Sequence, residues 1–142
     1  MFAFIKAFIA GFVSTLTFHQ GLLWLFVAAG VLSGANTWNM APVPPFGVPS
    51  VISLAFWGGL WGMLLWLLIR RALAAGYYVG AIILGAIGPT LVYLFVVQWL
   101  KGQSMAEIFD HLSMARVGIG LALNGCWGLG VAVLMRIMHP PR

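Results

Sequence analysis

Apolar residues run along this chain in four long segments, and most charged side chains lie at or near the ends of those segments. The segments lie near 7–32, 50–69, 76–100 and 115–138. Each is long enough to cross the hydrocarbon core of a bilayer, which takes about 20 helical residues. Backbone polar groups in hydrocarbon must be satisfied within the segment, so all four should be helices. The pattern predicts an all-α fold: an integral membrane bundle of four transmembrane helices in one domain, 1–142.

The composition agrees with this prediction. Hydrophobic residues make up 63% of the chain, charged residues 6%, and the mean hydropathy is +1.05, whereas about a quarter of a soluble domain is charged. The seven Lys and Arg against two acids give a pI near 10.2. These cations are scattered and do not form the clustered basic face of nucleic-acid-binding proteins. We therefore expect the lipid bilayer, and no nucleic acid, as a partner.

The charged residues between the segments differ on the two sides of the predicted bundle. One side carries Lys6, Arg70, Arg71, Arg136 and Arg142, and the other carries Lys101, Arg116, Glu107 and Asp110. Cytoplasmic loops carry an excess of Lys and Arg. We therefore expect both termini in the cytoplasm, with the bundle in a bacterial inner (plasma) membrane.

A short motif occurs twice in the chain. Gly59-Leu60-Trp61-Gly62 precedes Arg70 at the same spacing at which Gly125-Cys126-Trp127-Gly128 precedes Arg136. Both copies run into the basic end of an apolar segment, which predicts two tandem two-helix repeats, 5–71 and 72–138. Two spans per repeat return the chain to the same side, so the repeats would be parallel. In a chain rich in Gly and Trp, coincidence is the alternative.

Small residues gather on one side of the second and fourth helices, opposite the tryptophans of the motif, when positions are placed about 100° apart. Such faces let helix backbones approach closely. The predicted packing residues are Gly58, Gly59, Gly62, Gly118, Ala122 and Gly125. We expect the glycines of the motif to face into the bundle and Trp61 and Trp127 to face away from it. For Trp57 and Trp61, an aromatic wall for a quinone, pigment or sterol is the alternative to lipid-facing or interhelical bulk.

Polar residues inside the spans define a candidate site near the bilayer midplane. They are Ser14, Thr17, His19, Gln20, Thr90 and Asn124. An unpartnered polar group is costly in hydrocarbon. We therefore expect His19 and Gln20 to form interhelical hydrogen bonds with Thr90 or Asn124. The same layer is also where a solute pathway would run.

His19 is the only histidine, acid, lysine or arginine deep within a span, and such residues are functional candidates by default. As an axial ligand it would hold a haem or chlorophyll, although His111 and His139 lie outside the predicted core. We find no catalytic triad, paired acids or metal-ligand set within the spans. The single Cys126 excludes an internal disulfide. We expect no catalytic residue, metal or other cofactor, with a tetrapyrrole at His19 as an alternative.

The loop before the fourth span predicts a further short helix. Ser104 and Glu107 have the spacing of a capping box. The apolar residues that then recur at helical spacing are Met105, Ile108, Phe109 and Leu112. They predict an amphipathic helix on the outer membrane surface.

These observations favour a non-enzymatic membrane protein that works through helix association. It would assemble with itself or serve as an accessory subunit of a larger membrane complex, so its partners would be membrane-protein subunits or further copies. The hypothesis depends on the small-residue faces, the missing catalytic set and the small size. The alternatives are a small-solute channel or transporter, and a pigment or electron-transfer subunit that uses His19.

Overall fold

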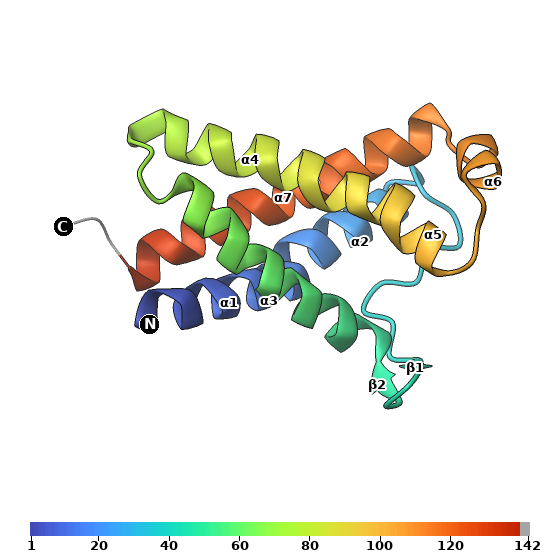
Figure 1. Cartoon of the computed structure of the whole chain (residues 1–142), viewed down its shortest axis with the longest axis horizontal. Helices are drawn as coiled ribbons and strands as arrows, with labels where there is room; N and C mark the ends of the chain where they lie inside the picture. Colours follow the sequence, from blue (N-terminus) through green and yellow to red (C-terminus); the bar gives the residue numbers. More distant parts are fainter. Residues whose placement is uncertain (140–142) are drawn as a thin grey trace.

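Four helices long and apolar enough to cross a membrane form the structure, as the sequence predicts. The computed structural model describes residues 1–139. The four helices run over Phe2–Ala28, Ser50–Ile69, Ala74–Leu100 and Met114–Met138. The described part of the chain begins and ends at one end of the bundle, where the turn between the second and third long helices also lies (Figure 1). We call this the basic end and the opposite end the loop end.

Two of the long helices contain π-helical segments that the sequence analysis did not predict. In chain order the elements are α1 (Phe2–Ser14), η1 (π-helical, Thr15–His19), α2 (Gln20–Ala28), β1 (Pro42–Val43), β2 (Val48–Pro49), α3 (Ser50–Ile69), α4 (Ala74–Leu91), η2 (π-helical, Val92–Val97), α5 (Gln98–Leu100), α6 (Met105–Asp110) and α7 (Met114–Met138). Strands β1 and β2 pair antiparallel in a small hairpin at the loop end. Segment η2 follows Pro89, which has no backbone N–H to donate within the helix.

The first long helix ends earlier than its hydropathy predicts. Gly30 adopts a φ of 73°. Its N–H donates to the carbonyl of Val27 (3.1 Å), and the N–H of Val31 donates to the carbonyl of Phe26 (2.9 Å). These two bonds form a Schellman motif, which favours glycine because the residue must be left-handed. The predicted span of 7–32 is therefore wrong at its end, since a backbone stop signal outweighs the apolar residues that follow.

Helices α1 and α3 pack closely through glycines. A Cβ atom on Gly11 would overlap the carbonyl group of Gly58 and stand 3.0 Å from the Cα of Gly62. A Cβ on Gly62 would in turn stand 2.7 Å from the carbonyl oxygen of Ala7. The two backbones are therefore in direct contact, which only glycine permits at these positions.

Helices α4 and α7 repeat this arrangement. A Cβ on Gly85 would stand 3.0 Å from the carbonyl oxygen of Asn124 and 2.8 Å from the Cα of Gly128. A Cβ on Gly128 would overlap the carbonyl oxygen of Ala81. In each pair the first helix contributes an alanine and a glycine four residues apart, Ala7 and Gly11 or Ala81 and Gly85. The second helix contributes two residues at the same spacing, Gly58 and Gly62 or Asn124 and Gly128.

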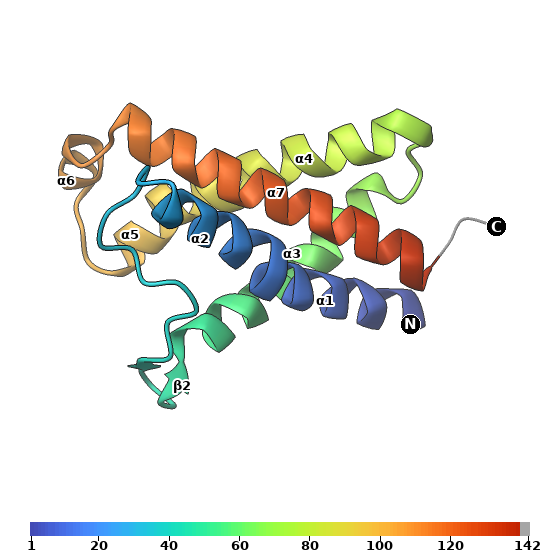
Figure 2. The same cartoon turned by 180° about the vertical axis from the view of Figure 1, so that it is seen from behind.

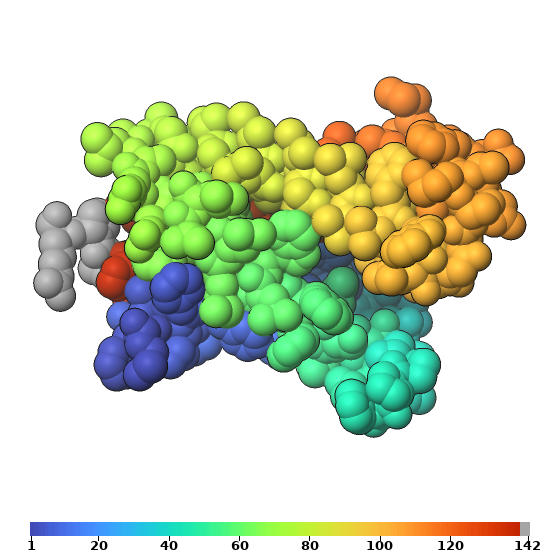
Figure 3. Space-filling view, viewed as in Figure 1, coloured from blue at the N-terminus to red at the C-terminus, as the bar shows by residue number. Residues whose placement is uncertain are grey.

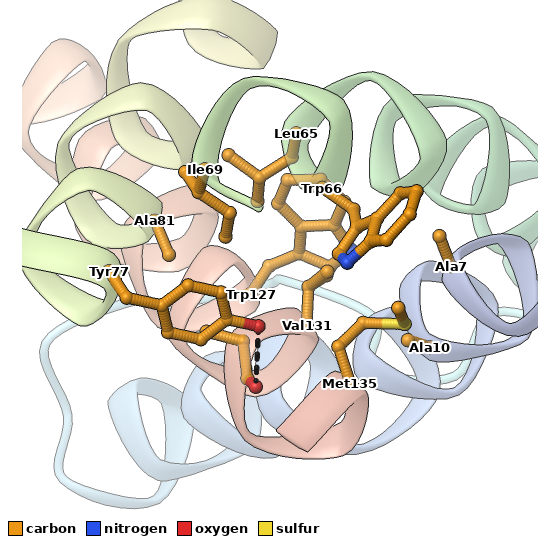
Figure 4. Packing of buried hydrophobic residues seen from close by; sticks show 11 residues of the cluster. Ala7, Ala10, Leu65, Trp66, Ile69, Tyr77, Ala81, Trp127, Val131 and Met135 are labelled. Atoms are coloured by element: carbon orange, nitrogen blue, oxygen red, sulfur yellow. Dashed lines mark hydrogen bonds between the residues drawn. The ribbon is translucent and has the colours of Figure 1, made fainter. Parts of the chain in front are cut away.

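Helix α7 lies between α1 and α4 and is therefore buried on two sides (Figure 2). The buried apolar cluster consists of Ala7, Ala10, Leu65, Trp66, Ile69, Tyr77, Ala81, Trp127, Val131, Ala132 and Met135 (Figure 4). Trp127 is only 3% exposed. Our expectation that this tryptophan faces away from the bundle is wrong, because the side of α7 opposite α4 is covered by α1. Trp61 is partly buried against the cluster, and Trp57 is 58% exposed.

The short helix α6 begins with the predicted capping box. Ser104 Oγ accepts a hydrogen bond from the Glu107 N–H (3.3 Å), and Glu107 Oε2 accepts one from the Ser104 N–H (2.7 Å). The hydrogen bonds from the Ser104 side chain and backbone lower the pKa of Glu107 below its ordinary value. The helix ends at Asp110, and the Phe109 ring contacts Phe95 of η2 (centroids 5.7 Å apart). Its place on a membrane surface stays a prediction.

Candidate functional site

One group of buried polar contacts joins the first long helix to α7. Ser14 Oγ donates a hydrogen bond to the carbonyl of Trp127 (2.7 Å), and Trp127 Nε1 donates one to the carbonyl of Gly11 (3.0 Å). Thr15 Oγ1 donates to the same carbonyl (2.9 Å). Ser14 is predicted from the sequence as a site residue, but its acceptor Trp127 and the further acceptor Gly11 are not. This group connects the α1–α3 pair to the α4–α7 pair at the centre of the bundle.

A second polar contact lies within the α4–α7 pair. Asn124 Nδ2 donates a hydrogen bond to Thr90 Oγ1 over 2.9 Å, and Thr90 is 1% exposed. Both residues belong to the predicted midplane layer. Because Thr90 is shielded from water within the bundle, this bond contributes to holding α4 and α7 at one register.

The Asn124–Thr90 bond gives a testable coupling. In a double-mutant cycle with Asn124→Ala and Thr90→Val, we expect a coupling free energy of about 0.6 kcal/mol, the average for such bonds in membrane helices. The measurement is reversible unfolding in mixed micelles of dodecylmaltoside and SDS. Thr90→Ser serves as the control, because it keeps the hydroxyl group and should keep the coupling. Additive effects of Asn124→Ala and Thr90→Val would contradict the assignment.

His19 and Gln20 do not bond Thr90 or Asn124, so that part of the prediction is wrong. Gln20 Nε2 lies 3.4 Å from His19 Nδ1, and Gln20 Oε1 accepts a hydrogen bond from the Trp38 N–H (2.9 Å). The physical reason is the π-helical segment before Gln20. Its hydrogen bonds span five residues instead of four, so each residue turns through a smaller angle and later side chains point in new directions.

Trp38 ties the first loop to this part of the helix, a role that the sequence analysis missed. Its indole Nε1 donates to the carbonyl of Leu16 (2.8 Å). Trp38 also has a positive φ of 47°, which is rare for a bulky side chain. On the other side of η1, Cys126 Sγ lies 3.6 Å from the carbonyl of Phe18. Side chains from the loop and from α7 thus bond two carbonyls of the π-helical segment.

The predicted midplane residues therefore belong to separate local groups. Thr17, the one residue of this set not yet described, is exposed and donates a hydrogen bond to the carbonyl of Val13 (2.8 Å). Every buried side-chain nitrogen or oxygen atom in the described part of the chain has a hydrogen-bond partner. Two hollows on the bundle, described below, are lined by other residues. The geometry does not bring these residues together around a shared cavity.

The predicted packing residues divide into two sets. Gly58, Gly59, Gly62 and Gly125 lie at contacts between helices. Gly118 and Ala122 are exposed, and a Cβ on Gly118 would meet no atom within 4 Å. Their expected role in packing within the bundle is therefore wrong. The reason is that the first long helix ends at Ala28, and the chain leaves the first turns of α7 uncovered.

The other two histidines lie far from His19 along the bundle. His111 follows α6 at the loop end, and the ring of His139 contacts Trp66 at the basic end (centroids 5.9 Å apart). Among residues 1–139, no three His, Cys, Asp or Glu side chains come together. His19 thus has no histidine opposite it that would complete a pair of axial ligands, and tetrapyrrole binding there stays an untested alternative.

Comparison with family models, with curated proteins and with solved structures finds no match to this chain. The proposals below rest on the residues and their geometry.

Proposed function

We propose that this protein is a non-enzymatic assembly component of a membrane, in which a helix of a partner packs on the first half of α7. The partner is a further copy of the chain or a subunit of a larger membrane complex. The observation that carries the proposal is an exposed row of small residues, Ala115, Gly118 and Ala122, which we call the α7 small face. It borders an open groove of about 350 Å³, completed by Phe26, Val31 and Ile119.

The spacing of the α7 small face suits contact with another helix. Ala115, Gly118 and Ala122 stand at i, i+3 and i+7, on one side of a helix. None carries an atom beyond Cβ, so a partner backbone can approach closely. In lipid, that close approach supplies the van der Waals contact that drives helix association. The second half of α7 uses Gly125 and Gly128 in the same way against α4.

The hydrogen bonds of the buried polar residues favour a role for them in holding the helices together rather than in lining a solute pathway. Ser14, Thr90 and Asn124 each have a hydrogen-bond partner across a helix interface. Both hollows are lined by apolar side chains and glycines. The polar groups are thus used to hold helices together.

The placement of charges supports a topology with both termini in the cytoplasm of a bacterial cell and the bundle in its inner membrane. The basic end holds Lys6, Arg70, Arg71 and Arg136, while the loop end holds Lys101, Glu107, Asp110 and Arg116 (Figure 1). Lys6 Nζ also donates a hydrogen bond to the carbonyl of Met138 (2.6 Å), which joins the first and last helices there. Arg142, counted with the basic end in the sequence analysis, lies outside the described residues.

The proposed architecture includes two tandem parallel repeats, 5–71 and 72–138. The recurrence of the same glycine contacts in the α1–α3 and α4–α7 pairs supports it. The contact of Gly62 with Ala7 and Gly11 corresponds to that of Gly128 with Ala81 and Gly85. The first helices of the two halves correspond at this contact although their remaining sequences differ.

The assembly proposal predicts a selective effect of Gly118→Leu. We expect association in lipid vesicles to weaken at least about tenfold, or about 1.4 kcal/mol, because the added side chain would separate the two backbones. The thermal stability of the isolated chain should not change, since Gly118 is exposed. The measurement is energy transfer between labelled copies, together with photo-crosslinking from position 122 in native membranes to capture a different subunit.

Gly76→Leu is the matched control, because a Cβ at Gly76 also meets no atom within 4 Å but lies outside the α7 small face. It should associate as the wild type does. A strictly monomeric protein with no cross-linked partner would refute the proposal. So would a Gly118→Leu variant that keeps full association.

A further inference from the structure

Helices α3 and α4 meet near the turn that joins them and separate toward the loop end (Figures 1 and 3). At the turn, the Cγ2 methyl group of Ile69 lies 3.6 Å from where a Cβ on Gly80 would stand. Beyond this contact a groove of about 180 Å³ opens between the two helices. Its lining includes Trp61 and Leu68 of α3, Leu84, Gly88 and Pro89 of α4, and Trp127 of α7. We call it the α3–α4 groove.

The chemistry of the α3–α4 groove fits a hydrocarbon occupant. Its side chains are aliphatic or aromatic, and Pro89 has no N–H to leave unbonded. Gly88 keeps it open, because a Cβ there would stand 3.2 Å from the Trp61 ring. The volume is on the order of the about 150 Å³ apolar cavity that binds benzene in a well-studied case. The groove therefore accommodates a section of a hydrocarbon chain.

The basic end of the groove carries two adjacent cations. Leu68 lines the groove, and Arg70 and Arg71 follow it directly in the turn. Helix α3 ends at Ile69, one residue after Leu68, and Arg71 lies in the turn two residues beyond that end. Both arginines are exposed. The Arg70 guanidinium lies over the ring of Trp66, which is not a groove residue, 5.7 Å from its centroid. An occupant with its hydrocarbon part in the groove would thus have its polar head near Arg71, with the charge of Arg70 close by.

No acidic side chain neutralises this end among the described residues. The only two acids of the chain, Glu107 and Asp110, lie in or beside α6 at the loop end. A third cation, Arg136, lies over the Tyr77 ring of α4 at the basic end, 4.1 Å from its centroid. The excess positive charge beside an apolar groove is complementary to an anion that carries a hydrocarbon chain.

From this combination we infer that the α3–α4 groove is a binding site for an anionic phospholipid. The phosphate group lies at Arg70 and Arg71, and part of one acyl chain lies between α3 and α4. Basic pockets between helices on the cytoplasmic side are a known mode of headgroup recognition. The inference goes beyond helix association and does not depend on it, because the groove and the α7 small face lie on different parts of the bundle.

Native mass spectrometry of the full chain tests this site. The protein is reconstituted in nanodiscs of equal parts phosphatidylglycerol and phosphatidylcholine, and the retained lipids are counted after release. We expect the wild type to retain phosphatidylglycerol selectively. Arg70→Gln combined with Arg71→Gln should lower that retention at least about tenfold, because cations near the surface attract anionic lipid. Gly88→Leu, which fills the groove and leaves every charge in place, should lower it comparably.

Two controls separate a bound lipid from the general lipid annulus. Lys101→Gln combined with Arg116→Gln removes two cations from the loop end and should retain lipid as the wild type does. Gly76→Leu adds the same side chain outside the groove and should also behave as the wild type. Equal retention of both lipids by the wild type would overturn the inference, as would full retention by a folded Gly88→Leu variant. If Gly88→Leu does not fold, Gly88→Ala is the test, since its single methyl group already meets the Trp61 ring.

Discussion

Replacing Gly128 with alanine is expected to lower the free energy of unfolding by about 3 kcal/mol, the upper part of the usual range for overpacked sites. The added Cβ would overlap the carbonyl oxygen of Ala81 and stand 3.1 Å from the Cα of Gly85. Both neighbours are backbone atoms, so no side chain can move aside. The α4 and α7 backbones would have to separate, which weakens their van der Waals contact along the whole interface.

The measurement for Gly128→Ala is the midpoint of unfolding in mixed dodecylmaltoside and SDS micelles. Gly76→Ala is the matched control within α4, because a Cβ there meets no atom within 4 Å. Since alanine favours helix over glycine by up to about 1 kcal/mol, the control should be as stable as the wild type or slightly more stable. If Gly128→Ala were equally stable, the close contact of α4 and α7 would be wrong.

Trp127→Ala is expected to cost about 3–5 kcal/mol, the range for deleting a buried aromatic side chain. Trp127 is 3% exposed, and its indole donates a hydrogen bond to the carbonyl of Gly11 (3.0 Å). Its removal would leave a cavity between α7 and α1 and remove one link between the two helix pairs. Trp127→Phe keeps most of the ring and loses only the N–H donor, so it should cost about 1 kcal/mol.

Size-exclusion chromatography after stepwise heating in detergent measures the Trp127 variants without relying on tryptophan fluorescence. Trp57→Ala serves as the control, because Trp57 is 58% exposed. Surface substitutions usually change stability by less than about 0.5 kcal/mol. A loss of stability in Trp57→Ala as large as in Trp127→Ala would contradict the difference in burial between the two tryptophans.

The four long apolar helices could be predicted because a membrane would impose strong rules on the backbone of such segments. Helix α3 covers Ser50–Ile69, the residues that hydropathy alone assigns to the second span. The rules fail where a local backbone signal acts against hydropathy. Gly30 ends the first helix through its left-handed conformation, although apolar residues continue beyond it.

The polar residues of the candidate site were found from the sequence, but most of their partners were not. Asn124 and Thr90 both lie within α-helical segments, α7 and α4, and their side chains share a hydrogen bond. His19 is the last residue of a π-helical segment and Gln20 follows it, so the directions of both side chains change. No propensity in the sequence indicates that segment, so a regular helical projection places both residues incorrectly.

The packing faces of the helices are likewise only partly predictable from the sequence. A projection of α7 alone separates small residues from Trp127, and it correctly places Gly125 against α4. It does not show that α1 covers the opposite side and buries Trp127. It also does not show that Gly118 stays exposed beside a groove that Phe26 of the first long helix borders. Which side of a helix is covered depends on its neighbours, and these are known only from the assembled bundle.

The glycine contacts also have a consequence for the order in which the chain can be built. Gly11 meets Gly58 and Gly62 within the first two long helices, and Gly85 meets Gly128 within the last two. The closest backbone contacts therefore join helices that are consecutive in the chain. During synthesis, the first helical hairpin can pair as soon as its second helix has entered the bilayer, before α4 is made. Insertion then leaves one late step, the docking of two preformed hairpins.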